Sequence, residues 1–536
     1  MNIGILRTIG KTAFTAAVAL VLSIGIFAQS NTGTITGTVQ DANGAAVPNA
    51  SVKLTNVGTN ETKTVTTDGN GVYRAPSLSN GVYKVSVTAS GFQPTSITDA
   101  RLAVGDTLRV NITVGVQGVE AAVEVTADQT PTDTETATLG DTVLQARIQD
   151  NPVNGRDFTQ LLATVPGSVQ STNQFQTAIN GIPSTFGGSS VLVDGIDASR
   201  VDVNGTSNVL GRIESRVNRV SMDSIQEVQV LEQNYSAQYG EALGAVINPI
   251  TKSGTNDLHG SVFEYFRNEA LDAGDALAGK QRFRLNQFGG NLSGPIVKDK
   301  WFFFANYEGV RQTRGQTFNN LVYTQLFRNG LAPALRPLVD TIPLPQRPYI
   351  QPLSGLVDPN LGEYQSQRIA KLREDTGSVK IDYQQSDKSR FSARYNINDS
   401  NTDTPYGVGT NQMAPGKLRV QLFKLAHNYA FNARTTNEFG FGINHNFTDV
   451  GAGAEDMPRS DLSFVDFRIA TPGPAQFSQR RTGAVYQFLD TITMIRGNHS
   501  LKLGADIRLN RRSALSRQQY TLTYFGLAGG PGSTSF

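Results

Sequence analysis

The stretch SIQEVQVLEQNYSAQYGEALGAVINPITKSGTNDLHGSVFEYFRNEALDA, residues 224–273, contains a change in the kind of strand that the sequence predicts. Its first half holds short apolar runs with glycines between them: Val228 with Val230, and Val246 with Ile247. Its second half is richer in aromatic residues, and longer runs separated by turns follow it. We therefore expect a small domain of short buried strands to end within this stretch and long amphipathic strands to begin.

Downstream of this stretch, apolar and polar residues alternate with a period of two. Val379, Ile381 and Tyr383 alternate with polar residues, and the same period recurs in residues 391–398, 438–447 and 501–510. Residues 301–307 place aromatic side chains on both faces, which suits a membrane interface. Apolar-out, polar-in alternation is typical of transmembrane β-barrels, although a soluble sandwich could also show it. Strand length and an export signal favour the barrel.

The connections between these strands alternate in length. Residues 386–389, 432–435 and 497–500 form short turns, whereas residues 311–372 and 449–481 form long connections rich in proline or polar residues. In a barrel, short turns face the periplasm and long loops face the exterior, where they can gather a ligand.

Composition and the N-terminus indicate an exported protein without thiol chemistry. The 536 residues carry a net charge of +2, which gives no nucleic-acid footprint, and they include no cysteine. Arg7 and Lys11 precede an uncharged apolar run at residues 13–27, which predicts a signal peptide over residues 1–28. The alternative is a membrane anchor, but the run is shorter than the roughly 20 residues that span a bilayer.

Residues 32–118 predict a small β-sandwich. Short alternating runs recur at a spacing of about ten residues, with glycine and asparagine turns between them. The turn at residues 68–71, Asp-Gly-Asn-Gly, could be read as a calcium loop, but it has too few ligands for an EF-hand, so a hairpin turn is preferred.

No catalytic, metal or cofactor site emerges from the sequence. The four histidines lie far apart, and neither an HExxH motif, a GxSxG elbow nor a Walker A loop occurs. We therefore predict that the protein is not an enzyme and needs no cofactor.

Several segments carry a resemblance to a known family. NPVNGRDFTQLLATVPGS at residues 151–168 and VLVDGID at residues 191–197 resemble the plug domain of TonB-dependent outer-membrane receptors. TKSGTNDLHGSVFEYFRN and NQFGGNLSGPIVKDKWFFFANYEG resemble the Oar-like branch of these receptors. TGTVQDANGAAVPNASVKL, near the N-terminus, resembles a carboxypeptidase-regulatory-like domain, which is a non-catalytic module.

Taken together, the patterns and the resemblance predict a mainly β protein. An N-terminal Ig- or prealbumin-like β-sandwich is followed by an α/β plug domain and by part of a transmembrane antiparallel β-barrel. The predicted boundaries are a signal peptide (1–28), the sandwich (32–118), a linker (119–139), the plug (140–257) and the partial barrel (258–536).

Within the linker, one short segment resembles the TonB box, the extended strand that the periplasmic partner captures. It consists of Val123, Glu124, Val125, Thr126 and Ala127. Such a box needs only an unpaired, β-prone strand on a flexible tether. The alternative is that these residues form the last strand of the sandwich, or a spacer.

The plug candidate contains two motifs that match the family's wording. They are Asn154-Gly155-Arg156-Asp157 and Asp194-Gly195. Arg156 is expected either to pair with carboxylates on the barrel wall or to lie in a surface turn. Short helices are predicted at residues 142–148 and 158–162, and strands at residues 191–193 and 227–231.

The resemblance implies an outer-membrane transporter. Its partners would be TonB with the ExbB–ExbD motor, outer-membrane lipid, and an extracellular ligand such as a siderophore, cobalamin, an oligosaccharide or a peptide. A surface structural or adhesion protein on the same fold is the competing interpretation, and an exported enzyme is a third.

One departure from the family concerns length. Family barrels have about 22 strands, whereas residues 259–536 can hold roughly ten to twelve. The glycine-rich C-terminal end, residues 526–536, also lacks the alternation of a membrane strand. The sequence is therefore expected to be truncated and not to close a full barrel by itself.

Overall fold

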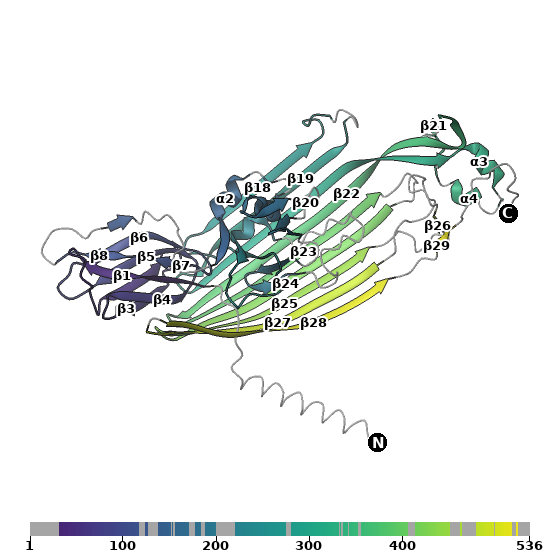
Figure 1. Ribbon diagram of the computed structural model, residues 1–536. Coiled ribbons are helices and arrows are strands. Elements are labelled where there is room, and N and C mark those ends of the chain that lie inside the picture. The colour runs from purple at the N-terminus through teal and green to yellow at the C-terminus, as the bar shows by residue number, and fades with distance from the viewer. Residues whose placement is uncertain are drawn as a thin grey trace, which may run out of the picture.

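The computed structural model is built almost entirely of β-strands (Figure 1). It describes residues 32–116, 124–126, 138–151, 153, 156–170, 177–183, 188–199, 220–274, 280–331, 333, 336–340, 342–351, 355–405, 413–450, 461–463, 479–497, 499–516 and 521–523. None of the helices in this part of the chain has the length and apolar character needed to cross a membrane. The predicted signal peptide lies outside the described residues.

The N-terminal strands form two sheets packed face to face, here called the sandwich. One sheet has the order β4-β1-β7 with β8 also on β1, and the other has the order β3-β2-β5-β6-β9. The strands are β1 (Gly33–Asp41), β2 (Ser51–Asn56), β3 (Thr62–Thr66), β4 (Val72–Leu78), β5 (Gly81–Thr88), β6 (Thr95–Leu102), β7 (Thr107–Arg109), β8 (Ile112–Val114) and β9 (Glu124–Thr126). The sequence patterns missed β6, whose burial alternates only partly.

Alternation along these strands produces the sandwich core. Leu54, Val85 and Val87 are fully buried between the sheets. The hydroxyl of the buried Tyr73 donates to the Val110 carbonyl at 2.7 Å, and that of Tyr83 donates to Ser79 at 2.8 Å. Each ring thus adds apolar area to the core without leaving its hydroxyl group unpaired.

A second unit, here called the inner domain, follows in the chain. It contains the sheet β10-β16-β17-β14-β15, in which β14 and β17 are parallel, and the smaller sheet β11-β12-β13. Its elements are β10 (Leu139–Leu144), α2 (Gln145–Asp150), η2 (Phe158–Thr164), β11 (Ser168–Gln170), β12 (Thr177–Ile179), β13 (Ile182–Pro183), β14 (Ser189–Val193), β15 (Ile196–Asp197), η4 (Met222–Ser224), β16 (Ile225–Gln233) and β17 (Ala245–Thr251).

The predicted strands at residues 191–193 and 227–231 are confirmed within β14 and β16. The helix predicted at residues 142–148 is wrong in its first half, because residues 142–144 belong to β10. There Val143 is fully buried opposite Val228, so sheet pairing overrides the local helical pattern. The helix at residues 158–162 exists as the 3₁₀ helix η2.

The C-terminal half forms one large antiparallel sheet of long strands. Its order is β18-β19-β20-β22-β23-β24-β25-β27-β28, with β21 beside β22. The strands are β18 (His259–Asn268), β19 (Phe283–Val297), β20 (Trp301–Tyr323), β21 (Arg347–Ile350), β22 (Val357–Ser386), β23 (Ser389–Pro405), β24 (Met413–Asn432), β25 (Thr435–Val450), β27 (Gln479–Arg496) and β28 (His499–Ser516). β26 (Asp461–Ser463) and β29 (Thr521–Thr523) pair separately. Among the described strands, β18 and β28 are the two edges, so the sheet is open.

The predicted alternation is confirmed on this sheet. Val379 and Ile381 point outward with exposed fractions of 48% and 36%, whereas the neighbouring Asp382 is 3% exposed. In β20, Trp301 and Tyr307 lie outside while Phe302 and Phe304 are buried inside. An aromatic row lies near the short turns, where the Trp301 ring stacks on Tyr383 with centroids 4.1 Å apart.

The long connection predicted at residues 311–372 is mostly strand instead. β20 and β22 stay paired from Trp301↔Tyr383 to Tyr323↔Leu361, which forms a two-stranded ribbon beyond the rest of the sheet (Figure 1). Helices α3 (Gln325–Gly330) and α4 (Arg336–Val339) lie at its tip. The buried cluster of Val322, Tyr323, Val339 and Ile342 gives this ribbon a core of its own, which the polar sequence does not reveal.

Gly37 provides a test of the sandwich packing. A Cβ at this position would lie 1.8 Å from the Val110 carbonyl oxygen, where the partner of β1 changes from β7 to β8. We expect Gly37→Ala to lower the free energy of unfolding by about 3 kcal/mol because of this overpacking. Urea unfolding of the detergent-solubilised protein would measure the loss. Gly69→Ala, where a Cβ would meet no atom within 4 Å, is the control and should change little.

Candidate functional site

The turn between β14 and β15 brings the predicted Asp194-Gly195 motif against the large sheet. Asp194 has a φ of 50° and Gly195 a φ of 79°. Two successive positive φ angles define the tight hairpin turn for which Asp-Gly is a preferred pair. Val193 and Ile196 on either side of the turn are buried. The turn itself projects from the inner domain toward the inner face of β22, β23 and β24.

The carboxylate of Asp194 is bound from both sides. Its Oδ2 lies 3.3 Å from Nε of Arg394 on β23, and both side chains are at most 5% exposed. From the inner domain, Thr251 donates its backbone N–H at 2.7 Å and its hydroxyl at 2.6 Å. Lys424 on β24 donates to the backbone carbonyl of Asp194. The turn is therefore fixed to the sheet by charged contacts that exclude bulk solvent.

The charge of Asp194 follows from these neighbours. Burial alone would raise the pKa of Asp194, but the cations of Arg394, Lys380 and Lys424 outweigh this effect and lower the pKa to about 2. The carboxylate is thus ionised at every physiological pH and forms a true ion pair with the sheet.

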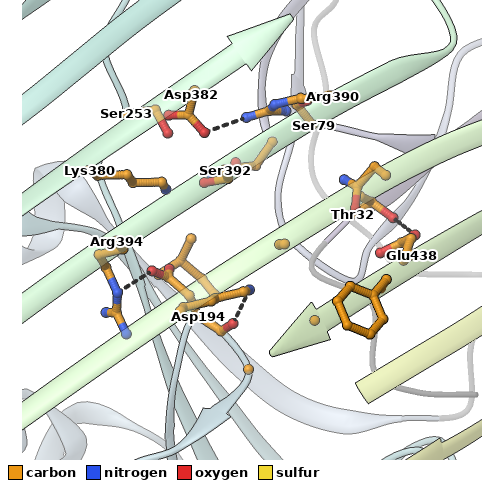
Figure 2. A pocket seen from close by; sticks show the side chains of 18 of the residues that line it. Thr32, Ser79, Asp194, Ser253, Lys380, Asp382, Arg390, Ser392, Arg394 and Glu438 are labelled. Atoms are coloured by element: carbon orange, nitrogen blue, oxygen red, sulfur yellow. Dashed lines mark hydrogen bonds and ion pairs between the residues drawn. The ribbon is translucent and has the colours of Figure 1, made fainter. Parts of the chain in front are cut away.

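A polar cavity of about 70 Å³ lies beside this turn (Figure 2). Its lining includes Asp194 and charged residues of four wall strands: Lys380 and Asp382 of β22, Arg390 and Arg394 of β23, Lys424 of β24 and Glu438 of β25. Sequence reasoning had placed Lys380, Asp382 and Arg394 on the inward face, but it did not connect them with Asp194. A cavity of this size and polarity is suited to ordered water.

The other predicted motif lies at a different part of the interface. Nη2 of Arg156 lies 2.5 Å from the Asp223 carboxylate of the inner domain. Its guanidinium group also covers the rings of Phe263 and Tyr265 on β18, at 4.7 and 4.5 Å from their centres. Arg156 thus contacts the large sheet through aromatic faces rather than through a wall carboxylate.

Of the other three residues of the 154–157 motif, the structure describes only Asp157. Asp157 caps η2 by accepting the backbone N–H of Thr159 at 3.0 Å. Asn154 and Gly155 lie outside the described residues. Asp194 and Arg156 therefore contact the sheet separately, on different strands.

The segment predicted as a TonB box is described only in its middle. Glu124, Val125 and Thr126 form β9, which pairs in parallel with residues 96–98 of β6. Val123 and Ala127 lie outside the described residues. This pairing agrees with the alternative of a last sandwich strand.

Sequence reasoning missed the contact between the sandwich and the inner domain. Oε1 of Glu227 on β16 accepts the Val104 backbone N–H at 2.8 Å, and the Gln229 side chain donates to the Val104 carbonyl at 3.0 Å. Burial raises the pKa of Glu227, the Val104 N–H opposes this effect and the neighbouring Asp106 carboxylate adds to it, and together they raise the pKa to about 7. In the sequence Glu227 and Gln229 alternate with Val228 and Val230 as in a half-exposed strand, so the pattern did not indicate that these two polar side chains are buried.

Comparison with known proteins identifies the large sheet. Residues 250–535, more than half of the chain, match the family described as "Outer membrane beta barrel domain". The chain belongs to this outer-membrane β-barrel family. Residues 34–115 match the carboxypeptidase regulatory-like domain. The large sheet is accordingly barrel wall, and the protein is assigned to the outer membrane.

Curated relatives are transporters and receptors by name. The TonB-dependent transporter Oar of Myxococcus xanthus is 30% identical over 320 residues, which are 56% of this chain and 29% of that protein. The ferrienterobactin receptor of Escherichia coli K12 is 28% identical over 237 residues, 40% of this chain and 30% of that protein. The chain thus spans less than a third of the length of these relatives.

The sequence identity to solved structures is lower than that to the curated relatives. The outer membrane transporter YddB from Escherichia coli is 14% identical, with a TM-score of 0.44 over 68% of this chain and 47% of that chain. The siderophore receptor PirA from Pseudomonas aeruginosa is 18% identical, with a TM-score of 0.34 over 70% of this chain and 56% of that chain.

The outer face of the barrel wall has the dimensions of a membrane-spanning surface. On β20, the outward residues run from Trp301 through Tyr307 to Arg311, whose guanidinium pairs with Asp375 at 2.6 Å. The ten steps from Trp301 to Arg311, at about 3.3 Å each and tilted by roughly 40°, span about 25 Å along the membrane normal. This matches the apolar band of outer-membrane barrels.

Metal binding finds no support in the described part of the chain, which contains no group of three or more histidine or acidic side chains placed around one point. The arrangement around Asp194 pairs opposite charges. It holds a folded domain against a wall, and its contacts can be broken and re-formed without covalent chemistry.

Asp194→Asn tests the ion pair between the inner domain and the wall. The substitution leaves the buried Arg394 cation without its ion-pair partner and removes a counter-charge from the half-buried Lys380 and Lys424, so we expect the free energy of unfolding to fall by about 3–5 kcal/mol. Urea denaturation of the protein in detergent would measure it. Asp272→Asn breaks a half-exposed pair with Arg267 and should cost at most about 1 kcal/mol; equal losses for both variants would contradict the assignment.

Glu227 predicts a pH dependence with a defined sign. Because its folded-state pKa is raised, the protonated form favours the folded state, and this contribution is complete below about pH 4.5, the ordinary value. It declines as the pH rises to about 7. Urea unfolding between these pH values should show this decline, and Glu227→Gln should remove it. Glu264→Gln, at an exposed position on β18, should leave the profile unchanged.

Proposed function

We propose that this protein is an outer-membrane transporter that binds an extracellular ligand and imports it into the periplasm with energy delivered by TonB. The names of the curated relatives, a TonB-dependent transporter and a ferrienterobactin receptor, support this assignment. The inner domain acts as the plug of the barrel.

The observation that carries the proposal is the set of contacts between the inner domain and the wall. Beyond the Asp194–Arg394 pair, the Asp197 backbone N–H donates to Gln487 on β27 at 2.8 Å. Ser221 donates to Glu308 on β20 at 2.5 Å. An adhesion protein has no need of a folded domain held inside its wall by polar contacts. A transporter needs contacts of this kind, because water can replace them when the plug moves.

Energy has to reach the plug from outside the outer membrane. This membrane offers neither nucleotide nor an ion gradient, so work is delivered mechanically by TonB with its ExbB–ExbD motor. We assign the capture site to residues 123–127, whose middle residues form β9 at the edge of its sheet, where a partner strand can be added on the side away from β6.

The ligand belongs to one of the classes that such receptors carry: a siderophore, cobalamin, an oligosaccharide or a peptide. It would first contact the outer ends of the inner domain and the ribbon formed by β20 and β22. Ferric enterobactin, the ligand in the name of the Escherichia coli relative, is the first probe to use.

Site-directed crosslinking tests the proposal. Cysteines are placed singly at Val123, Val125 and Ala127, in a chain with no native cysteine, and the periplasmic domain of TonB is added to outer membranes. We expect crosslinks at these sites that strengthen when the ligand binds. A cysteine at Val57, an exposed sandwich residue, is the control.

Either result of this experiment decides whether TonB binds residues 123–127. Crosslinks confined to residues 123–127 support an energised receptor and supply an assay for its ligand. Absence of crosslinks at all three sites would contradict the TonB assignment and favour the structural or adhesive function.

A further inference from the structure

The sandwich contacts the barrel wall through side chains that are almost completely buried. It lies at the end of the large sheet that carries the short turns (Figure 1). Thr32 donates its hydroxyl to Oε1 of Glu438 on β25 at 2.6 Å, and the two residues are 8% and 4% exposed. The Ser77 hydroxyl lies 2.6 Å from that of Thr436 and donates to the same Glu438 oxygen at 3.0 Å.

The backbone of the sandwich is adapted to this contact. Ser77 has a φ of 54°, which is unusual for a residue other than glycine and is found here inside a strand. The pairing of β1 with β4 shifts register between Gly33 and Ile35, beside the same strand end. Strain of this kind persists where surrounding contacts hold it, and here the wall residues Thr436 and Glu438 do so.

A second set of contacts joins the sandwich to the neighbouring turns. The Asn60 side chain donates to Asp299, in the turn between β19 and β20, at 2.9 Å. The Asn256 backbone N–H donates to the Gly58 carbonyl at 2.8 Å. The sandwich therefore bridges two separate parts of the wall, at β19–β20 and at β25.

The same domain also holds the inner domain. Val104, which is 1% exposed, is bonded through both its N–H and its carbonyl to Glu227 and Gln229 of β16. A Cβ on the adjacent Gly105 would lie 2.7 Å from the Gln229 side chain, so the two surfaces are in close contact.

The sandwich also closes the cavity beside the Asp194 turn. Thr32, Ser79 and Asn80 line this cavity together with Asp194 and Lys380 (Figure 2). The ion pair that fixes the inner domain to the wall therefore lies behind the sandwich, shielded from the periplasmic solvent on that side.

We infer that the sandwich is a latch, which must leave the barrel rim before the inner domain can move. The requirement for movement rests on the proposed function, whereas the docking itself does not. β9 pairs with β6 of the same sandwich, and β6 leads within two residues to Val104. A partner that pulls on residues 124–126 would therefore load the sandwich before it loads the inner domain.

A reversible crosslink tests the latch without ligand or TonB. Ser77→Cys with Thr436→Cys places a disulfide across the docked interface, in a chain without native cysteine. Hydrogen exchange of β16 and β17 is then measured in the oxidised and the reduced protein. If undocking precedes opening of the inner domain, oxidation should slow this exchange about tenfold, and reductant should restore it.

Two further variants make the result unambiguous. Asn60→Cys with Asp299→Cys links the same domain to the other part of the rim and should slow exchange in the same way. Lys53→Cys with Ser86→Cys links β2 to β5 within the sandwich and should leave exchange in the inner domain unchanged. Equal exchange rates in the oxidised and reduced forms of both rim-linked variants would overturn the latch. A failure of TonB crosslinking would overturn the proposed function alone, since this measurement uses neither TonB nor ligand.

Discussion

A charge removed from water has to be paired, and this requirement organises the interior of the protein. Asp194 projects from the inner domain beside Arg394, Lys380 and Lys424 of the barrel wall and supplies these cations with a buried counter-charge. The wall cations and the turn carboxylate stabilise each other only when the inner domain is in place. The position and orientation of the domain then follow from this carboxylate together with the contacts of Asp197 and Ser221 on other strands of the wall.

The wall can supply these cations because its strands have a period of two. Outward residues such as Val379 and Ile381 face lipid, and the residues between them face the interior. A strand buried on both faces would be apolar throughout and would offer the inner domain only non-directional packing. Here the interface combines both kinds of contact, since Leu418, Val420 and Leu422 of β24 join the apolar core of the inner domain.

The sandwich extends the same principle to the rim. Its contacts with Glu438 and Glu227 are few, polar and buried, which makes them specific in geometry. Contacts of this type favour one docked arrangement and yet lose little when water replaces them, in contrast to a large apolar interface. The N-terminal domain is therefore suited to an interface that opens and closes.

Local pattern was sufficient for most of the fold. Alternation gave the sandwich strands and the barrel hairpins, and Asp-Gly marked the turn at residues 194–195, because strand faces and tight turns depend on neighbouring residues. Where the pattern failed, at β10 and in the ribbon of β20 and β22, pairing with distant strands overrode it. The site was predicted only in part: Asp194, Arg156 and the inward wall residues were recognised, but their partners were not.

The sequence by itself determined the fold class, the turn that carries Asp194 and the two faces of the wall. Only the tertiary structure decided that Asp194 meets Arg394 from a distant part of the chain, that Arg156 covers the rings of β18, and that the sandwich docks on Glu438. The physical reason is that charge pairing and docking depend on distances through space, whereas turn and strand preferences are set within a few residues of the backbone.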